Sequence, residues 1–168
     1  IPLRLVGSEM CIRDSNHTLS AGPSDGKSVL DKCVPGYYHR RNMDGFYENS
    51  TCCNNTASEN SMMERLIVDD LVHWAIDYKV DGFRFDLMGH IMLRTIIKAR
   101  DALASLTVEK DGVDGRSIYL YGEGWDYAEV ERNRVGVNAS QLNLAGTGVG
   151  SFNDRLREGI MGLSLIHI

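Results

Sequence analysis

The sequence is poor in proline, aromatic residues and positive charge, and it has no long hydrophobic run. It holds only 3 prolines in 168 residues, and Phe, Trp and Tyr make up 8% of the chain. Its 18 lysines and arginines are outnumbered by 23 acidic residues, for a formal net charge of −5. A transmembrane helix needs about 20 consecutive apolar residues, and no such run is present. We therefore expect neither a membrane segment nor a broad nucleic-acid surface.

Several chemical signatures are also missing. There is no phosphate-binding loop, no G-x-S-x-G elbow and no H-E-x-x-H zinc motif, which argues against three common enzyme classes. The 4 cysteines form no C-x-x-C pair, and no cysteine–histidine set has zinc-finger spacing. The sequence thus predicts no metal ligands. We expect the adjacent Cys52 and Cys53 to be reduced loop or core residues rather than a redox device.

The clearest secondary-structure signal is a helix over SMMERLIVDDLVHWAIDYK, residues 61–79. Its apolar residues recur at steps of three and four, as on one helical face. Ser61 and Glu64 have the spacing of a capping box. The preceding residues 16–60 lack periodicity and are predicted to form a long connecting segment, which is unusual in a compact domain unless it is functional.

After this helix, strands and helices alternate. A strand is expected within residues 80–90, a helix near 92–106, a strand at 118–121, and a helix from about Asn153 after a glycine-rich loop. Such alternation predicts a parallel α/β sheet, because parallel neighbours need a crossover helix. A doubly wound sheet and a (β/α)8 barrel both fit. A barrel normally needs about 250 residues, so this chain can supply only part of one.

Charged residues stand at the ends of the two predicted strands. VDGFRFDLMGH carries Arg84 and Asp86, and YGEGW carries Glu123. Adjacent strands run about 4.8 Å apart, so the two carboxylates can emerge side by side, as in retaining glycosidases. Arg84 shares a strand face with Asp86 and would keep it ionised as a nucleophile. Glu123 has no basic neighbour in sequence, so partial desolvation would favour its protonated form, which suits a general acid.

A structural reading of the same residues fits the spacing equally well: Arg84 and Asp86 form an ion pair and Glu123 caps a helix. His90 follows Asp86 by four residues and either lines the same cleft or is a core histidine. Trp125 offers a stacking surface for a sugar ring, although packing alone also explains it.

The two motifs VDGFRFDLMGH and IYLYGEGWDYAEV resemble the second and third signature regions of the α-amylase superfamily (glycoside hydrolase family 13), in their pullulanase and limit dextrinase form. The likeness to plant-type limit dextrinase extends to SVLDKCVPGYYHRRNMDGFYENS, NNTASENSMMERLIVDDLVHWAIDYK and SQLNLAGTGVGSFNDRLREGI, and covers roughly residues 27–163. The resemblance implies a partial (β/α)8 TIM barrel, with about strands 4 and 5 and their flanking helices and loops. It also implies cleavage of α-1,6-glucosidic branch links in pullulan and limit dextrins, with retention of configuration.

By the same resemblance, Asp86 is the nucleophile and Glu123 the general acid/base. The residues implied to bind substrate are Arg84, His90, Trp125, Asn54 and Asn55. The chemistry requires no cofactor, although a structural calcium ion is compatible with the family. The implied partner is an α-glucan and the implied location a plastid. The competing hypothesis is a non-catalytic glucan-binding or regulatory protein derived from the same fold.

The two ends of the chain do not fit this family. Residues 1–15 and 164–168 resemble translated adapter sequence, so we expect non-native ends around a catalytic-domain fragment at 16–163. The family's first region, an asparagine–histidine pair, and its fourth region, with a histidine and an aspartate, are not found. Asn16–His17 resembles the end of the first region, but it lacks a preceding apolar strand, so no role is assigned to it.

Overall fold

The computed structural model describes residues 10–50 and 52–162. Within these residues the strands are β1 (Met10–Arg13), β2 (His17–Thr18), β3 (Asn54–Asn55), β4 (Gly82–Phe85), β5 (Tyr119–Gly122) and β6 (Gly150–Ser151). The α-helices are α1 (Val29–Cys33), α2 (Ser61–Tyr78), α3 (Leu93–Ala104), α4 (Val108–Asp111) and α5 (Asp154–Met161). Three 3-10 segments, η1 (Met88–His90), η2 (Gly115–Ser117) and η3 (Ala128–Asn133), complete the described part.

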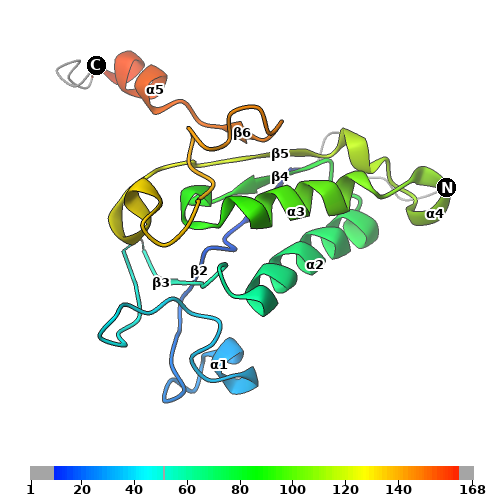
Figure 1. Ribbon diagram of the computed structural model, residues 1–168. Helices are drawn as coiled ribbons and strands as arrows, with labels where there is room; N and C mark the ends of the chain where they lie inside the picture. Colours follow the sequence, from blue (N-terminus) through cyan, green and yellow to red (C-terminus); the bar gives the residue numbers. More distant parts are fainter. Residues whose placement is uncertain (1–9, 51, 163–168) are drawn as a thin grey trace.

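The main sheet has the order β1-β4-β5-β6, and each neighbouring pair is parallel. β4 lies between β1 and β5, and α3 makes the crossover from β4 to β5. This arrangement confirms the α/β class and the parallel sheet predicted from the alternation. The separate pair β2–β3 is antiparallel and lies below the end of the main sheet in Figure 1.

Helices α2 and α3 lie side by side along the sheet and cover its apolar face (Figure 1). In β4, Phe83 and Phe85 alternate with Arg84, so the two phenyl rings face the helices and are fully buried. The helices contribute the apolar residues of their inner faces: Met63, Ile67, Leu71 and Ala75 from α2, and Ile96, Ala99 and Leu103 from α3. This core anchors β4, and therefore fixes the position of the residues that follow it.

The capping-box prediction for α2 is wrong. Asn60 is the N-cap residue, it makes no side-chain capping bond, and Ser61 is already the first helical residue. The Glu64 carboxylate points away from the helix start and binds Arg94 at 2.9 Å, as well as Lys98. Two cations on α3 outcompete one backbone N–H for this buried carboxylate, so Glu64 links the two helices instead of capping one.

Residues 10–13, set aside in the sequence analysis as part of a foreign end, take part in the fold. They form β1, whose register with β4 runs from Met10↔Gly82 to Arg13↔Phe85. Alternating burial along Met10–Arg13 fits a strand with one inward face. The non-native origin of residues 1–15 and 164–168 stays a prediction. Residues 1–9, 51 and 163–168 lie outside the described residues.

The other predicted boundaries shift by a few residues. β4 is shorter than the apolar run suggested, β5 begins one residue later than predicted, and α3 occupies the inner part of the predicted range. Asn153 caps α5, since its side chain accepts a hydrogen bond from Leu156 N. Among the described residues, no helix has the length and apolar character to cross a membrane.

Candidate active site

Two carboxylates meet at the carboxyl ends of β4 and β5. In the parallel register Phe85 pairs with Gly122, so the next residues, Asp86 and Glu123, leave neighbouring strands side by side. Arg84 lies between them: its Nη1 donates to Asp86 Oδ1 at 3.0 Å and its Nη2 donates to Glu123 Oε1 at 2.6 Å. One guanidinium therefore holds both carboxylates. All three side chains remain partly open to solvent, at 15–27% exposure.

The backbone also fixes the position of Glu123. Leu87 has a left-handed conformation, with φ 45° and ψ 44°, which is rare for a residue with a side chain. This turn points the Leu87 N–H at Glu123 Oε2, 2.9 Å away. Backbone strain of this kind persists where surrounding structure enforces it, and it concentrates at functional sites.

The surroundings of Glu123 differ from the prediction in one respect. No basic residue is adjacent to Glu123 in the sequence, whereas in the structure Arg84 contacts it directly. The reason is that Arg84 and Tyr121 are register partners on adjacent strands, so a residue 39 positions earlier lies next to Glu123. The predicted contact between Arg84 and Asp86 is confirmed.

Trp125 lines a pocket together with Arg84 and Glu123. This pocket has a volume of about 280 Å³ and is also lined by residues of the C-terminal segment. The indole Nε1 donates to Asp154 Oδ1 at 2.8 Å, which fixes the ring orientation. A larger hollow of about 630 Å³ is lined by Trp125 and Tyr127 among other residues. The position of Trp125 in the lining of both hollows fits its predicted role in binding substrate.

His90 is a buried residue of η1, only 1% exposed. Its ring packs edge-on against Tyr127 with 4.8 Å between centroids, and neither ring nitrogen has a hydrogen-bond partner among the described residues. Burial lowers the pKa of His90, although the nearby Glu129 carboxylate acts in the opposite direction. Its Nε2 lies 3.8 Å from Glu129 Oε2, a contact that is an ion pair only when the imidazole is protonated.

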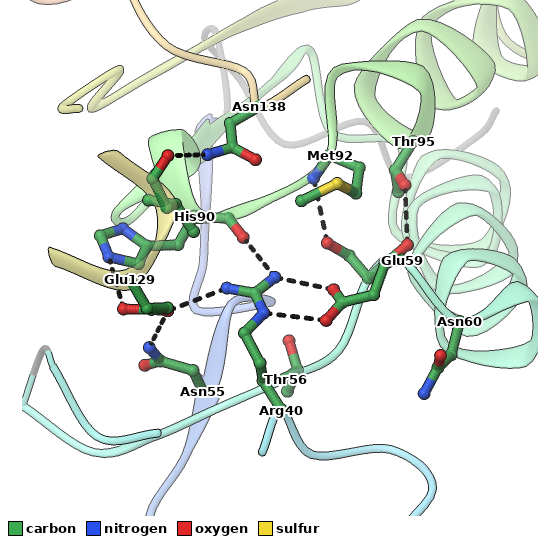
Figure 2. Close-up of polar contacts among 12 residues, drawn as sticks. Arg40, Asn55, Thr56, Glu59, Asn60, His90, Met92, Thr95, Glu129 and Asn138 are labelled. Carbon is green, nitrogen blue, oxygen red and sulfur yellow. Dashed lines mark hydrogen bonds and ion pairs between the residues drawn. The ribbon is translucent and has the colours of Figure 1, made fainter. Parts of the chain in front are cut away.

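Behind the site lies a buried ion network that sequence reasoning missed. Arg40 is 3% exposed and donates through Nε and Nη2 to Glu59, at 3.0 and 2.8 Å, and through Nη1 to Glu129, at 2.9 Å. A further bond from Nη2 reaches the carbonyl oxygen of His90, at 3.1 Å (Figure 2). The network joins the long segment 16–60 to η1 and η3. It holds this non-periodic segment against the loops that follow β4 and β5.

Asn55 belongs to this network. It is fully buried and donates through Nδ2 to Glu129 Oε1, at 2.6 Å, and to Ser50. Burial alone would raise the pKa of Glu129, but hydrogen bonds from Ser50 and Arg40 outweigh it and lower that pKa. Asn54 turns to the β2 side, with Nδ2 3.2 Å from the carbonyl of Leu19. The structure thus groups neither asparagine with the carboxylates, and their sugar contact stays a prediction.

Asn16 and His17 occupy a place that the sequence analysis did not assign to them. Their rejection rested on a missing strand, but β1 precedes them and pairs with β4, so that reason is wrong. Side-chain ligand atoms of Asp14, His17 and Asp86 all lie within 4.8 Å of one another. His17 therefore stands beside the Asp86 carboxylate.

The adjacent thiols of Cys52 and Cys53 lie close to His17. The Sγ atoms of Cys52 and Cys53 are 2.6 Å apart, and both lie within 4.8 Å of a His17 ring nitrogen. Hydrogen bonding to Cys53, together with burial, raises the pKa of the Cys52 thiol to about 11. Cys11, Cys33, Cys52 and Cys53 form no disulfide among the described residues.

Calcium does not fit these groups. Calcium takes six to eight oxygen ligands, whereas both clusters of His, Cys, Asp and Glu ligand atoms found in the described residues include a histidine nitrogen. No step of the chemistry below therefore involves calcium.

Comparison with known proteins identifies the relatives of this chain. It is 65% identical over 147 residues to "Pullulanase 1, chloroplastic" of Arabidopsis thaliana, covering 88% of this chain. It is 47% identical over 148 residues to the pullulanase of Klebsiella pneumoniae. The chain is a homologue of the pullulanases. It spans only 15% and 13% of the lengths of these two relatives.

The solved structures agree. The crystal structure of Klebsiella pneumoniae pullulanase complexed with maltotriose matches with a TM-score of 0.80 and 44% identity, over 91% of this chain and 14% of that one. No protein-family model matches the chain. The resemblance drawn from the two strand-end motifs is confirmed by relatives found through sequence and through structure.

Proposed function

We propose that this chain carries the two-carboxylate centre of a starch-debranching glycoside hydrolase, which cleaves α-1,6-glucosidic links in pullulan and limit dextrins. One observation carries the proposal: Asp86 and Glu123 emerge from adjacent parallel strands and share the guanidinium of Arg84. A single guanidinium spans only a few ångströms, so this arrangement favours the short carboxyl separation of about 5–5.5 Å found in retaining enzymes.

In the proposed mechanism Asp86 is the nucleophile and Glu123 the general acid and then the general base. Glu123 gives its proton to the glycosidic oxygen while an Asp86 oxygen bonds to the anomeric carbon and the leaving sugar departs. Water then attacks that carbon, loses its proton to Glu123, and frees the sugar from Asp86 with the original configuration.

The contact between Arg84 and Glu123 adds a requirement. The first step needs Glu123 to deliver a proton, so its contact with Arg84 must give way. We infer that a bound glucan excludes water from the pocket beside Trp125 and draws the Arg84 guanidinium toward Asp86.

We further propose that the four parallel strands belong to a (β/α)8 barrel, in which β4 and β5 are the fourth and fifth. The chain alone is expected to be inactive, because strand edges would stay unpaired and the catalytic set would be incomplete. The maltotriose complex of the Klebsiella relative supports an α-glucan partner. The chloroplastic name of the Arabidopsis relative supports a plastid location.

The decisive experiment replaces each carboxylate in an intact enzyme that contains this segment. We expect Asp86→Asn to abolish pullulan cleavage and Glu123→Gln to lower kcat by about 10²–10⁴-fold. Asp69→Asn, on the exposed face of α2, is the matched control and should change little. Substantial turnover by Asp86→Asn would overturn the nucleophile assignment, and an inverted first product in NMR would overturn retention.

The alternative is a non-catalytic glucan-binding or regulatory protein. Intact Asp86 and Glu123 argue against it. Binding of pullulan without any turnover by the intact protein would favour it. Maltotriose release by the 168-residue chain itself would refute the expectation that the chain is inactive alone.

A further inference from the structure

Three ligand groups of the metal-binding type meet outside the proposed chemistry. The side chains of His17, Cys52 and Cys53 place one ring nitrogen and two sulfur atoms within 4.8 Å of one another. Imidazole and thiolate are the ligands that zinc prefers, whereas magnesium and calcium prefer oxygen.

The β2–β3 ladder brings these groups together. His17 pairs with Asn55 in the antiparallel register, and Cys53 lies two residues before Asn55. Cys53 lies in the bend that leads directly into β3, so the ladder brings it close to His17. Neighbouring Cys52 then brings its thiol to the same corner. Thirty-five positions separate His17 from Cys52, which is why no motif spacing revealed the group.

His17 is oriented as a ligand. Its Nδ1 lies 2.6 Å from Oδ1 of the buried Asn16, and it donates its hydrogen there. The neutral ring then keeps a lone pair on Nε2. A hydrogen bond to the second ring nitrogen is the usual way in which proteins fix the tautomer of a metal-binding histidine.

The Asp86 carboxylate is available as a fourth ligand. His17 also belongs to the group with Asp14 and Asp86, whose ligand atoms again lie within 4.8 Å of one another. Four-coordinate zinc accepts histidine, thiolate and carboxylate ligands together. The two groups overlap at His17, so a cation bound by the thiols and His17 is adjacent to the Asp86 carboxylate.

We propose that His17, Cys52 and Cys53 bind a zinc-class divalent cation, with Asp86 completing the coordination. Binding displaces one proton from each thiol, so one cation releases two protons as two metal–sulfur bonds form. The bound cation occupies an Asp86 oxygen. Resting on the proposed function, the site therefore makes glucan hydrolysis sensitive to zinc, because the nucleophile is no longer free to attack.

The binding test uses cobalt(II), which gives intense charge-transfer absorption when thiolates coordinate it. The reduced 168-residue chain is titrated with cobalt, and zinc is then added to displace it. We expect saturation at one cobalt per chain, and at least a tenfold loss of affinity in Cys52→Ser, Cys53→Ser and His17→Ala. Cys33→Ser and His73→Ala are matched controls, since Cys33 and His73 are exposed and belong to neither ligand group.

His17→Ala also tests whether the fold is needed. Two adjacent thiols in an unfolded chain would bind cobalt without regard to a histidine so far away in sequence. Unchanged affinity in His17→Ala, or no thiolate absorption with the original chain, overturns the site. Asp86→Asn should lower the affinity relative to Asp69→Asn, and equal affinities would overturn the fourth ligand.

The second arm measures hydrolysis by the intact enzyme, each variant against its own metal-free rate. We expect zinc to inhibit the original enzyme and Cys52→Ser to require at least tenfold more zinc. If zinc does not inhibit hydrolysis, the proposal that the bound cation occupies an Asp86 oxygen is wrong. If the intact enzyme does not hydrolyse glucans at all, the proposed function fails, while the cobalt result still decides the metal site.

Discussion

Arg40 and Arg84 each join two carboxylates, and they do so under opposite conditions. Arg40 is 3% exposed, and its partner Glu129 accepts hydrogen bonds from Arg40, Ser50 and Asn55. Arg84 holds Asp86 and Glu123 at the edge of a pocket, and the three side chains remain 15–27% exposed.

The difference lies in how many acceptor positions remain. Glu129 is enclosed by donors, so it can only hold segments in place. Asp86 is 27% exposed, and Glu123 is 15% exposed and lines the pocket beside Trp125, so both carboxylates remain accessible to another molecule. An ion pair is thus structural or reactive according to its exposure and the completeness of its hydrogen bonds, not according to residue type.

The largest effect on stability is expected from removing the buried Arg40. Arg40→Met removes the cation and leaves two carboxylates without their main partner, so we expect a loss of about 3–5 kcal/mol in the free energy of unfolding. Urea unfolding of the chain, followed by tryptophan fluorescence, measures it. Arg65→Met is the control, because the exposed Arg65–Asp69 pair should contribute only about 0.2–0.5 kcal/mol. Equal losses in both variants would contradict the structural role of Arg40.

The corresponding change at Arg84 should affect rate rather than stability. In an intact enzyme, we expect Arg84→Met to lower kcat by about 10²–10³-fold, as for the loss of one positioned electrostatic donor. The thermal midpoint should move little, since the guanidinium is partly solvated. Steady-state kinetics on pullulan and a thermal melt check this. An Arg84→Met variant with a lowered thermal midpoint and an unchanged kcat would contradict this prediction.

A smaller effect is expected from pH through His90. Burial lowers its pKa in the folded state, so between that value and the unfolded value of 6.5 the unfolded chain binds more protons. The stabilising contribution of neutral His90 is therefore complete above about pH 6.5 and is lost as pH falls through its folded pKa. We expect His90→Gln to flatten the decline of stability with acid, relative to the exposed His73→Gln, in urea titrations at several pH values. A slope unchanged by His90→Gln would refute this.

The sequence predicted the parts that depend on local pattern. Apolar periodicity located α2, the alternation of elements implied the parallel sheet, and strand-end placement paired Asp86 with Glu123. Long-range contacts were not accessible in this way. Arg40 and Glu129 are 89 positions apart, and Glu64 was misassigned because its cationic partners lie on α3, not in its own helix.

The missed role of Asn16–His17 has a different origin. It was rejected because no apolar strand was recognised before Asn16, yet Met10–Arg13 pair with β4 along their whole length. An edge strand forms through backbone hydrogen bonds to the neighbouring strand, even where its side chains do not by themselves favour a strand. Here the tertiary context decided the conformation, not the local propensity.

The left-handed turn at Leu87 has a consequence for how freely this corner can vary. The hydrogen bond from Leu87 to Glu123 comes from the main-chain N–H, which nineteen of the twenty amino acids possess. Natural drift at position 87 can therefore change the side chain without disconnecting the two strand ends, provided that the turn itself is kept. Proline alone is forbidden there, and glycine or asparagine would adopt the turn with the least resistance.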